Sequence, residues 1–150
     1  MSADLTTRMQ TTGVMDPHFF MSNSPRPSPL FDLTGRVVVV TGATGVLAGS
    51  AGRYLAAQGA HVVFLGRDQT RLDRALADTK GLPGITSGYS CDVLDREGLE
   101  KVRLAVLAQH GRIDALINAA GGNQPGAVIL PTQTFLDLDL NAYRQVLGLN

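Results

Sequence analysis

The feature that most constrains this sequence is a β-branched apolar run that leads directly into a glycine-rich turn. Residues 36–41 read Arg-Val-Val-Val-Val-Thr, and they are bounded by Gly35 and Gly42. A continuous run of this kind is typical of a strand buried on both faces of a parallel sheet. Helical spacing follows over residues 50–58, and residues 61–65 form a second apolar run. Together these segments predict a βαβ unit of about thirty residues. We expect its helix to bury one apolar side, made of Leu47, Ala51, Tyr54 and Leu55.

The alternation of strand and helix continues along the rest of the sequence. Helices are predicted over residues 68–80 and 95–110, a third, weaker strand over residues 85–91 and a fourth strand over residues 113–118; Asp139 begins a last helical segment. Each parallel crossover places a helix on one face of the sheet. The sequence therefore predicts an α/β fold, a Rossmann-type doubly wound parallel sheet with strand order 3-2-1-4, truncated after the fourth strand and the following helix.

Composition and charge argue against several classes of function. The 150 residues carry 13 Lys+Arg and 13 Asp+Glu, so the formal net charge is zero and does not attract a polyanion. Nucleic acid is therefore not expected as a partner. Apolar runs such as residues 37–40 are far shorter than the roughly 20 residues of a membrane span. Cys91 is the single cysteine, so no internal disulfide can form. We expect a cytoplasmic protein that does not enter a membrane.

The first thirty residues differ from the rest of the chain. They lack a periodic apolar face and end in a Pro/Ser-rich stretch over residues 24–29. We expect residues 1–30 to be a disordered extension and residues 31–150 to be the folded domain. An alternative is that Met21 is the true start of the protein.

The glycine turn is the segment that carries chemistry. Small residues there let the backbone approach a pyrophosphate, and the following helix offers free N–H groups and a favourable dipole. Gly42, Gly45 and Ala48 are the positions expected at this turn. The alternative is that the glycines only form a tight connection between strand and helix, but the complete βαβ context favours a dinucleotide site.

Three short motifs each stand at the end of a predicted strand: Thr41-Gly42-Ala43-Thr44-Gly45, Cys91-Asp92-Val93 and Asn118-Ala119-Ala120-Gly121. In this order they resemble the motifs of the short-chain dehydrogenase/reductase family. The resemblance covers residues 31–150 and implies that this is an NAD(P)-binding domain, incomplete at its C-terminus. We expect the cofactor to contact Gly42, Thr44, Gly45, Val46, Leu47, Arg67, Asp92, Val93, Asn118, Ala119, Ala120 and Gly121.

Further segments resemble a narrower branch of this family. Residues 31–35, the Gly45-Val46-Leu47 form of the turn, residues 118–123 and residues 134–138 are similar to the D-mannonate oxidoreductase (fructuronate reductase) or gluconate 5-dehydrogenase-like members. The usual family turn has glycines where this chain has Val46 and Ala48. The resemblance implies hydride transfer between a nicotinamide cofactor and a keto sugar acid, and a homo-oligomer for the full-length enzyme.

The resemblance also indicates which catalytic residues to look for. Members of the family use a Tyr with a Lys four residues later, together with a Ser and an Asn. Asn150 matches the catalytic Asn, but Tyr54, Tyr89 and Tyr143 are followed four residues on by Gln, Val and Leu. We therefore expect the chain to be the front part of a longer enzyme. Two alternatives stay open: a non-catalytic dinucleotide-binding module, and a fragment without function.

The end of the second strand bears on the choice of cofactor. NAD-preferring folds place an acid there to bind the ribose 2′-OH, whereas a nearby Arg can neutralise the 2′-phosphate of NADP. This chain has Gly66 at that position, followed by Arg67, which favours NADP over NAD. The alternative is that Arg67 is a solvated residue beside a helix cap. His61 and His110 lack metal-ligand spacing, so no metal is expected.

Overall fold

Four parallel strands form the sheet of the computed structural model, which describes residues 31–150. The strands are β1 (Val37–Thr41), β2 (His61–Gly66), β3 (Thr86–Ser90) and β4 (Ala115–Ile117). Their order is β3-β2-β1-β4, and every neighbouring pair is parallel, so the predicted topology is confirmed. The predicted extension over residues 1–30 lies outside the described residues.

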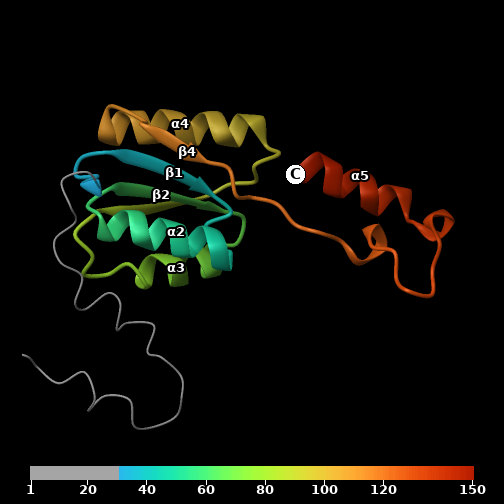
Figure 1. Cartoon of the computed structure of the whole chain (residues 1–150). Helices are drawn as coiled ribbons and strands as arrows, with labels where there is room; N and C mark the ends of the chain where they lie inside the picture. Colours follow the sequence, from blue (N-terminus) through green and yellow to red (C-terminus); the bar gives the residue numbers. More distant parts are fainter. Residues whose placement is uncertain (1–30) are drawn as a thin grey trace, which may run out of the picture. The chain divides into compact units, whose positions relative to one another are not determined.

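Helices cover both faces of this sheet. The α-helices are α2 (Val46–Ala57), α3 (Gln69–Ala77), α4 (Arg96–His110) and α5 (Leu140–Leu149), with short 3-10 turns over Pro125–Ala127 and Phe135–Asp137. In Figure 1, α2 and α3 lie on one face and α4 lies on the other. No helix described between residues 31 and 150 is both long enough and apolar enough to cross a membrane.

Aspartates begin three of these helices, as their positions in the sequence predict. Asp68 accepts a hydrogen bond from a backbone N–H at the start of α3, Asp95 does so at α4, and Asp139 does so at α5. Each carboxylate satisfies N–H groups that have no partner inside the helix. Gly111 ends α4 with a φ of 73°, a left-handed conformation that glycine adopts without strain.

The core consists of two layers, one on each side of the sheet. Because successive strand side chains point to opposite faces, Val38, Val40, Val62 and Phe64 pack under α2 and α3. The alternate residues Val37, Val39, Val63 and Leu65 pack against Val106 of α4. Both faces of β1 and β2 are therefore buried, which explains why the sequences of these two strands are continuously apolar.

The inner face of α2 differs from the one expected. Leu47 is 86% exposed and Tyr54 is 58% exposed, whereas Ala48, Gly52 and Ala56 are buried. A Cβ atom added to Gly52 would lie 2.5 Å from Cε1 of Phe64. The ring of Phe64 already fills the space beneath Gly52, so no side chain fits at that position of α2. Of the large residues expected on the inner side, Leu55 does pack against this core, partly buried.

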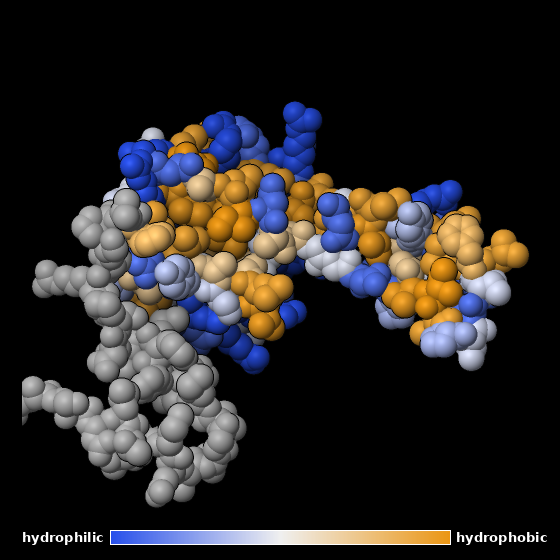
Figure 2. Space-filling model, in the orientation of Figure 1, coloured by the Kyte–Doolittle hydropathy of each residue, from blue (hydrophilic) through white to orange (hydrophobic). Residues whose placement is uncertain are grey.

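The segment after β4 carries exposed apolar side chains. Among the described residues β4 pairs only with β1, and Leu116 is 57% exposed. Leu140, Tyr143 and Leu147 of α5 are exposed as well. Figure 2 shows the hydrophobic surface that continues along residues 118–150.

Candidate functional site

A groove of about 250 Å³ lies at the carboxyl end of the parallel sheet. Its wall brings together segments that are far apart in the sequence: the turn after β1, the end of β2 and the turns after β3 and β4. Predicted cofactor residues make up most of it, namely Gly42, Thr44, Gly45, Arg67, Val93, Ala119, Ala120 and Gly121. Crevices at this edge of a doubly wound sheet are where such folds bind ligands.

Gly42 brings the turn after β1 against the turn after β4. Its φ is 65°, and a Cβ atom at this position would lie 2.6 Å from the carbonyl oxygen of Ala119. Any larger residue would push the two turns apart, because both the backbone conformation and the available space require glycine.

The N-terminus of α2 opens beside this turn without a side-chain cap. Gly45 is the N-cap residue and supplies no side-chain acceptor, whereas α3, α4 and α5 are each capped by an aspartate. The N–H groups of the first turn of α2 therefore stay available for another acceptor. Uncapped N–H groups at a glycine turn suit a pyrophosphate, so this part of the chain fits a dinucleotide.

Thr41 holds the two turns together, and sequence analysis did not single it out as a site residue. Its hydroxyl oxygen accepts hydrogen bonds from the backbone N–H groups of Ala119 and Ala120, both at 3.0 Å, and it donates to the carbonyl oxygen of Ile117 at 3.4 Å. One donor and two acceptor positions are all that a hydroxyl has. Thr41 therefore fixes the turn after β4, which forms one wall of the groove.

Two arginines line the groove at the end of β2. Arg67 follows the strand directly, and its Nη1 lies 4.0 Å from Oδ2 of Asp92. Arg71 reaches back from α3 and donates a long hydrogen bond, 3.4 Å, from Nη2 to the carbonyl oxygen of Thr44. Sequence analysis missed Arg71, although its position four residues after Arg67, on the first turn of a predicted helix, was a usable signal. Leu65, Gly66, Cys91 and Leu149 also line the groove and were not predicted.

Four of the predicted cofactor residues do not line this groove. Val46 and Leu47 are both 86% exposed on the first turn of α2. Asp92 reaches the site through its ion pair with Arg67. Asn118 lines a larger hollow of about 890 Å³ that continues between α4 and the end of α5. Ala48, expected at the glycine turn, is instead buried in the core because it lies on the inner side of α2.

Asn150, the predicted catalytic residue, also lines the larger hollow. Its side chain donates from Nδ2 to the carbonyl oxygens of Gly122 (2.9 Å) and Val146 (2.8 Å), and its Oδ1 accepts from the N–H of Gly122 at 3.2 Å. These bonds attach the end of α5 to the turn after β4. The arrangement places Asn150 beside the predicted cofactor segment.

Cys91 does not have the properties of a nucleophile. Burial raises the pKa of its thiol, and the carboxylates of Asp95 and Asp92 raise it further. Since the thiolate is the reactive form, this thiol stays protonated and unreactive near neutral pH. Cys91 acts as a small buried residue at the end of β3.

Two of the three histidines, His61 and His110, pair with each other. Nδ1 of His61 lies 3.3 Å from Nδ1 of His110, at the end of the sheet opposite the groove. Between residues 31 and 150 no three His, Cys, Asp or Glu side chains come together in a way that could hold a metal ion.

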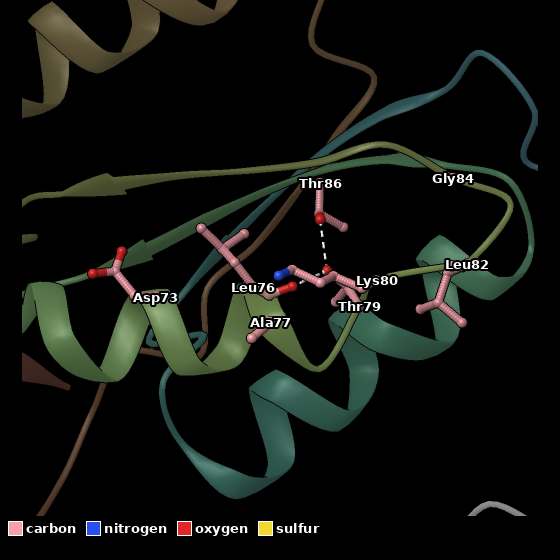
Figure 3. Close-up of a pocket in the computed structure, with 9 residues that line it drawn as sticks. Asp73, Leu76, Ala77, Thr79, Lys80, Leu82, Gly84 and Thr86 are labelled. Atoms are coloured by element: carbon pink, nitrogen blue, oxygen red, sulfur yellow. Dashed lines mark hydrogen bonds between the residues drawn. The ribbon is translucent and has the colours of Figure 1, made fainter.

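A further hollow of about 460 Å³ lies at the amino end of β3. Figure 3 shows Thr79 at its centre, bonded to the hydroxyl of Thr86 and to the carbonyl oxygen of Leu76, each at 2.6 Å. No predicted site residue lines this hollow. The hydrogen bonds of Thr79 connect the chain after α3 to the start of β3, so Thr79 has a structural role.

Known proteins resemble this chain over its described domain. Among curated relatives, the "Uncharacterized oxidoreductase UxuB" of Bacillus subtilis is 34% identical over 127 residues, which are 79% of this chain and 46% of the relative. Among solved structures, a candidate D-mannonate oxidoreductase from Haemophilus influenzae with bound NAD has a TM-score of 0.71 and 30% identity, over 79% of this chain and 46% of that one. A metagenomic short-chain oxidoreductase in complex with NADP has a TM-score of 0.64 and 29% identity, over 79% and 51%.

The matches agree on family and on extent. The chain spans about half the length of the curated relatives that it matches. Residues 36–150 fit the family described as short chain dehydrogenase, and this range includes all three motifs at the ends of β1, β3 and β4. This chain belongs to the short-chain dehydrogenase/reductase family.

Proposed function

We propose that this chain forms the cofactor-binding part of an NAD(P)-dependent oxidoreductase that transfers hydride between a nicotinamide cofactor and a keto sugar acid of the fructuronate or mannonate type. The observation that carries the cofactor part of this proposal is the glycine turn. Gly42 has no room for a side chain, and the N–H groups of the first turn of α2 beside it have no side-chain cap. These features suit a pyrophosphate held by backbone groups.

Each wall of the groove has a role in this proposal. Gly42, Thr44 and Gly45, with the first-turn backbone of Val46 and Leu47, hold the pyrophosphate. Asp92 and Val93 face the adenine, and Asn118 to Gly121 support the ribose on the nicotinamide side. When bound, the cofactor supplies or accepts the hydride. Asn150 lies next to the Asn118–Gly121 turn, where it positions groups at the reactive end.

NADP is the cofactor that the end of β2 favours. A Cβ atom at Gly66 would lie 2.7 Å from Cγ2 of Thr44, so the acid that binds a ribose 2′-OH does not fit there without a shift. Arg67 stands beside that position and offers a charge for a 2′-phosphate. One of the similar structures holds NAD and another holds NADP, so the likeness alone does not choose between them.

The substrate class is supported by the resemblance to the sugar-acid branch and by the similarity to a candidate D-mannonate oxidoreductase. Reduction of a keto acid adds hydride to the carbonyl carbon and a proton to the oxygen, so a proton donor must stand beside that oxygen. None of the tyrosines has a lysine four residues later. We assign the donor to a part of the full-length enzyme outside this sequence. We also propose that this enzyme is cytoplasmic and homo-oligomeric, as the resemblance to the family implies.

The proposal is tested in two steps. Calorimetric titration of the purified chain with NADPH and NADH measures cofactor binding, and failure to bind either nucleotide would contradict the proposal. For the whole enzyme, oxidation of NADPH is followed by absorbance with fructuronate, with fructose as a control that lacks the carboxylate. Turnover of fructuronate alone supports the keto-acid substrate.

The missing Tyr-Lys pair favours a second candidate, a non-catalytic dinucleotide-binding module. The coding sequence downstream of Asn150 separates the two. A Ser followed by Tyr-x-x-x-Lys supports the enzyme, whereas a stop codon directly after Asn150 supports the binding module.

A further inference from the structure

We infer that Arg71 is a specificity-determining residue, a second guanidinium that binds the 2′-phosphate of NADP(H) together with Arg67. This inference rests on the proposed nucleotide site. The two arginines come from different elements, since Arg67 follows β2 and Arg71 belongs to α3, yet both line the same groove beside the glycine turn.

The two guanidinium groups differ in what they already contact. Arg67 faces the carboxylate of Asp92 at 4.0 Å, so part of its charge is balanced inside the protein. For Arg71, no carboxylate of residues 31–150 lies within ion-pairing distance. Of the two, Arg71 therefore has the charge that remains available for an anionic ligand.

Arg71 is also held in place while most of its guanidinium N–H groups stay unused. The carboxylate of Asp68 accepts its backbone N–H at 3.0 Å and fixes the first turn of α3. Nη2 makes one long bond, 3.4 Å, to the carbonyl oxygen of Thr44. A guanidinium has five N–H donors, so most remain free to bind phosphate oxygens, for which arginine has matching geometry.

Asp68 is the acid closest in sequence to the position that binds a ribose 2′-OH in NAD-preferring folds. Its Oδ1 already accepts the N–H of Arg71, and it caps α3. Asp68 is thus engaged as the N-cap of α3, and Arg67 and Arg71 line the groove beside the glycine turn. This combination favours a phosphate over a hydroxyl at that point.

The test compares two small probes that differ only in the 2′-phosphate, 2′,5′-ADP and 5′-AMP, titrated into the purified chain by calorimetry. Arg71→Gln removes the charge and the guanidinium but keeps a shorter, polar side chain. We expect the affinity for 2′,5′-ADP to fall about 10- to 100-fold, the range for losing a hydrogen bond between charged groups, while the affinity for 5′-AMP is unchanged. Arg74→Gln is the matched control, because Arg74 lies on the same helix and does not line the groove.

The outcomes separate this inference from the proposal beneath it. If the unmodified chain binds neither probe, the nucleotide site itself is wrong. If it binds both probes equally well, the site stands and the phosphate preference fails, and the role of Arg71 fails with it. Equal loss of both probes in Arg71→Gln, with the unfolding midpoint unchanged, or a similar loss in Arg74→Gln, would overturn the assignment of Arg71.

Discussion

Gly66, the last residue of β2, lies directly against the methyl group of Thr44: a Cβ atom added to Gly66 would come within 2.7 Å of Thr44 Cγ2. Gly66 is buried, and Thr44 belongs to the glycine turn. The residue type at the end of β2 is therefore constrained by the residue in the turn after β1.

This contact predicts that Gly66→Asp destabilises the protein when made alone and is tolerated when combined with Thr44→Ser. The single change should lower the free energy of unfolding by about 1–3 kcal/mol, as overpacking usually does. Thr44→Ser removes Cγ2, so the double variant should recover most of that loss and bind NADH better relative to NADPH. Urea unfolding of all four proteins in the cycle measures the coupling. An equal cost of Gly66→Asp in both backgrounds would show that Thr44 is not the obstacle.

Gly45 provides a test of the uncapped helix. Gly45→Ser should change the free energy of unfolding by only a few tenths of a kcal/mol, because serine is a good N-cap residue and the backbone there is extended. Nucleotide affinity should nevertheless fall about tenfold, since the new hydroxyl competes with phosphate for the N–H groups of α2. Ala108→Ser, at an exposed position of α4 that lines neither the groove nor the larger hollow, is the control. Unchanged affinity in Gly45→Ser would remove this helix end from the site.

Thr41→Val should destabilise the domain although valine has nearly the same shape. The change leaves the N–H groups of Ala119 and Ala120 without their acceptor, at a cost of about 1–3 kcal/mol in the free energy of unfolding. Thr41→Ser keeps the hydroxyl and should retain most of the stability. Thr70→Val, at an exposed position of α3, controls for the loss of a hydroxyl as such. A Thr41→Val protein as stable as the Thr70→Val protein would contradict this role.

Asp114 makes the stability of the sheet depend on pH in the acid range. Its carboxylate accepts the backbone N–H of Val37 at 2.8 Å and also bonds Arg112 and Arg36, and these contacts lower its pKa to about 2. The unfolded chain has the ordinary aspartate pKa of about 3.9. The stabilisation is therefore complete above that value and is lost as the pH falls toward about 2.

We expect Asp114→Asn to be less stable than the unmodified chain at pH 7, with the difference shrinking between about pH 4 and pH 2. Urea unfolding at several pH values follows this difference. Asp73→Asn is a suitable control, because Asp73 contacts only the exposed side chain of Gln69 among the described hydrogen bonds. A difference between the two proteins that does not change with pH would rule out the carboxylate charge as its cause.

Sequence periodicity predicted the fold well where local rules decide it. The valine run of β1 and the aspartates that begin α3, α4 and α5 depend on near neighbours in the chain, and the structure matches both. The prediction for the inner face of α2 was right for Leu55, which packs against the core, and wrong for Leu47 and Tyr54, which are exposed. Hydropathy favoured those two residues, whereas the side that meets the sheet is set by Phe64, which belongs to another element and leaves no room for a side chain at Gly52.

The candidate site was predicted only in part for the same reason. Motifs identified the turns that meet at the groove, since each follows a strand end. The contact between Thr41 and Ala119 joins residues 78 positions apart, and no local pattern contains it. For Arg71, the spacing from Arg67 indicated that the two side chains lie near each other, but its place in the groove depends on how α3 packs against the glycine turn.

The close approach of α2 to Phe64 determines which residues of this helix can be replaced when the protein is engineered. On most surface helices, large apolar residues are the ones to leave alone, and alanines or glycines are the ones to replace. Here Tyr54 is exposed and can be exchanged for a charged residue to improve solubility, whereas Gly52 has no room for a side chain and Ala56 is fully buried. A library that protected residues of α2 by hydrophobicity would vary the wrong half of the helix.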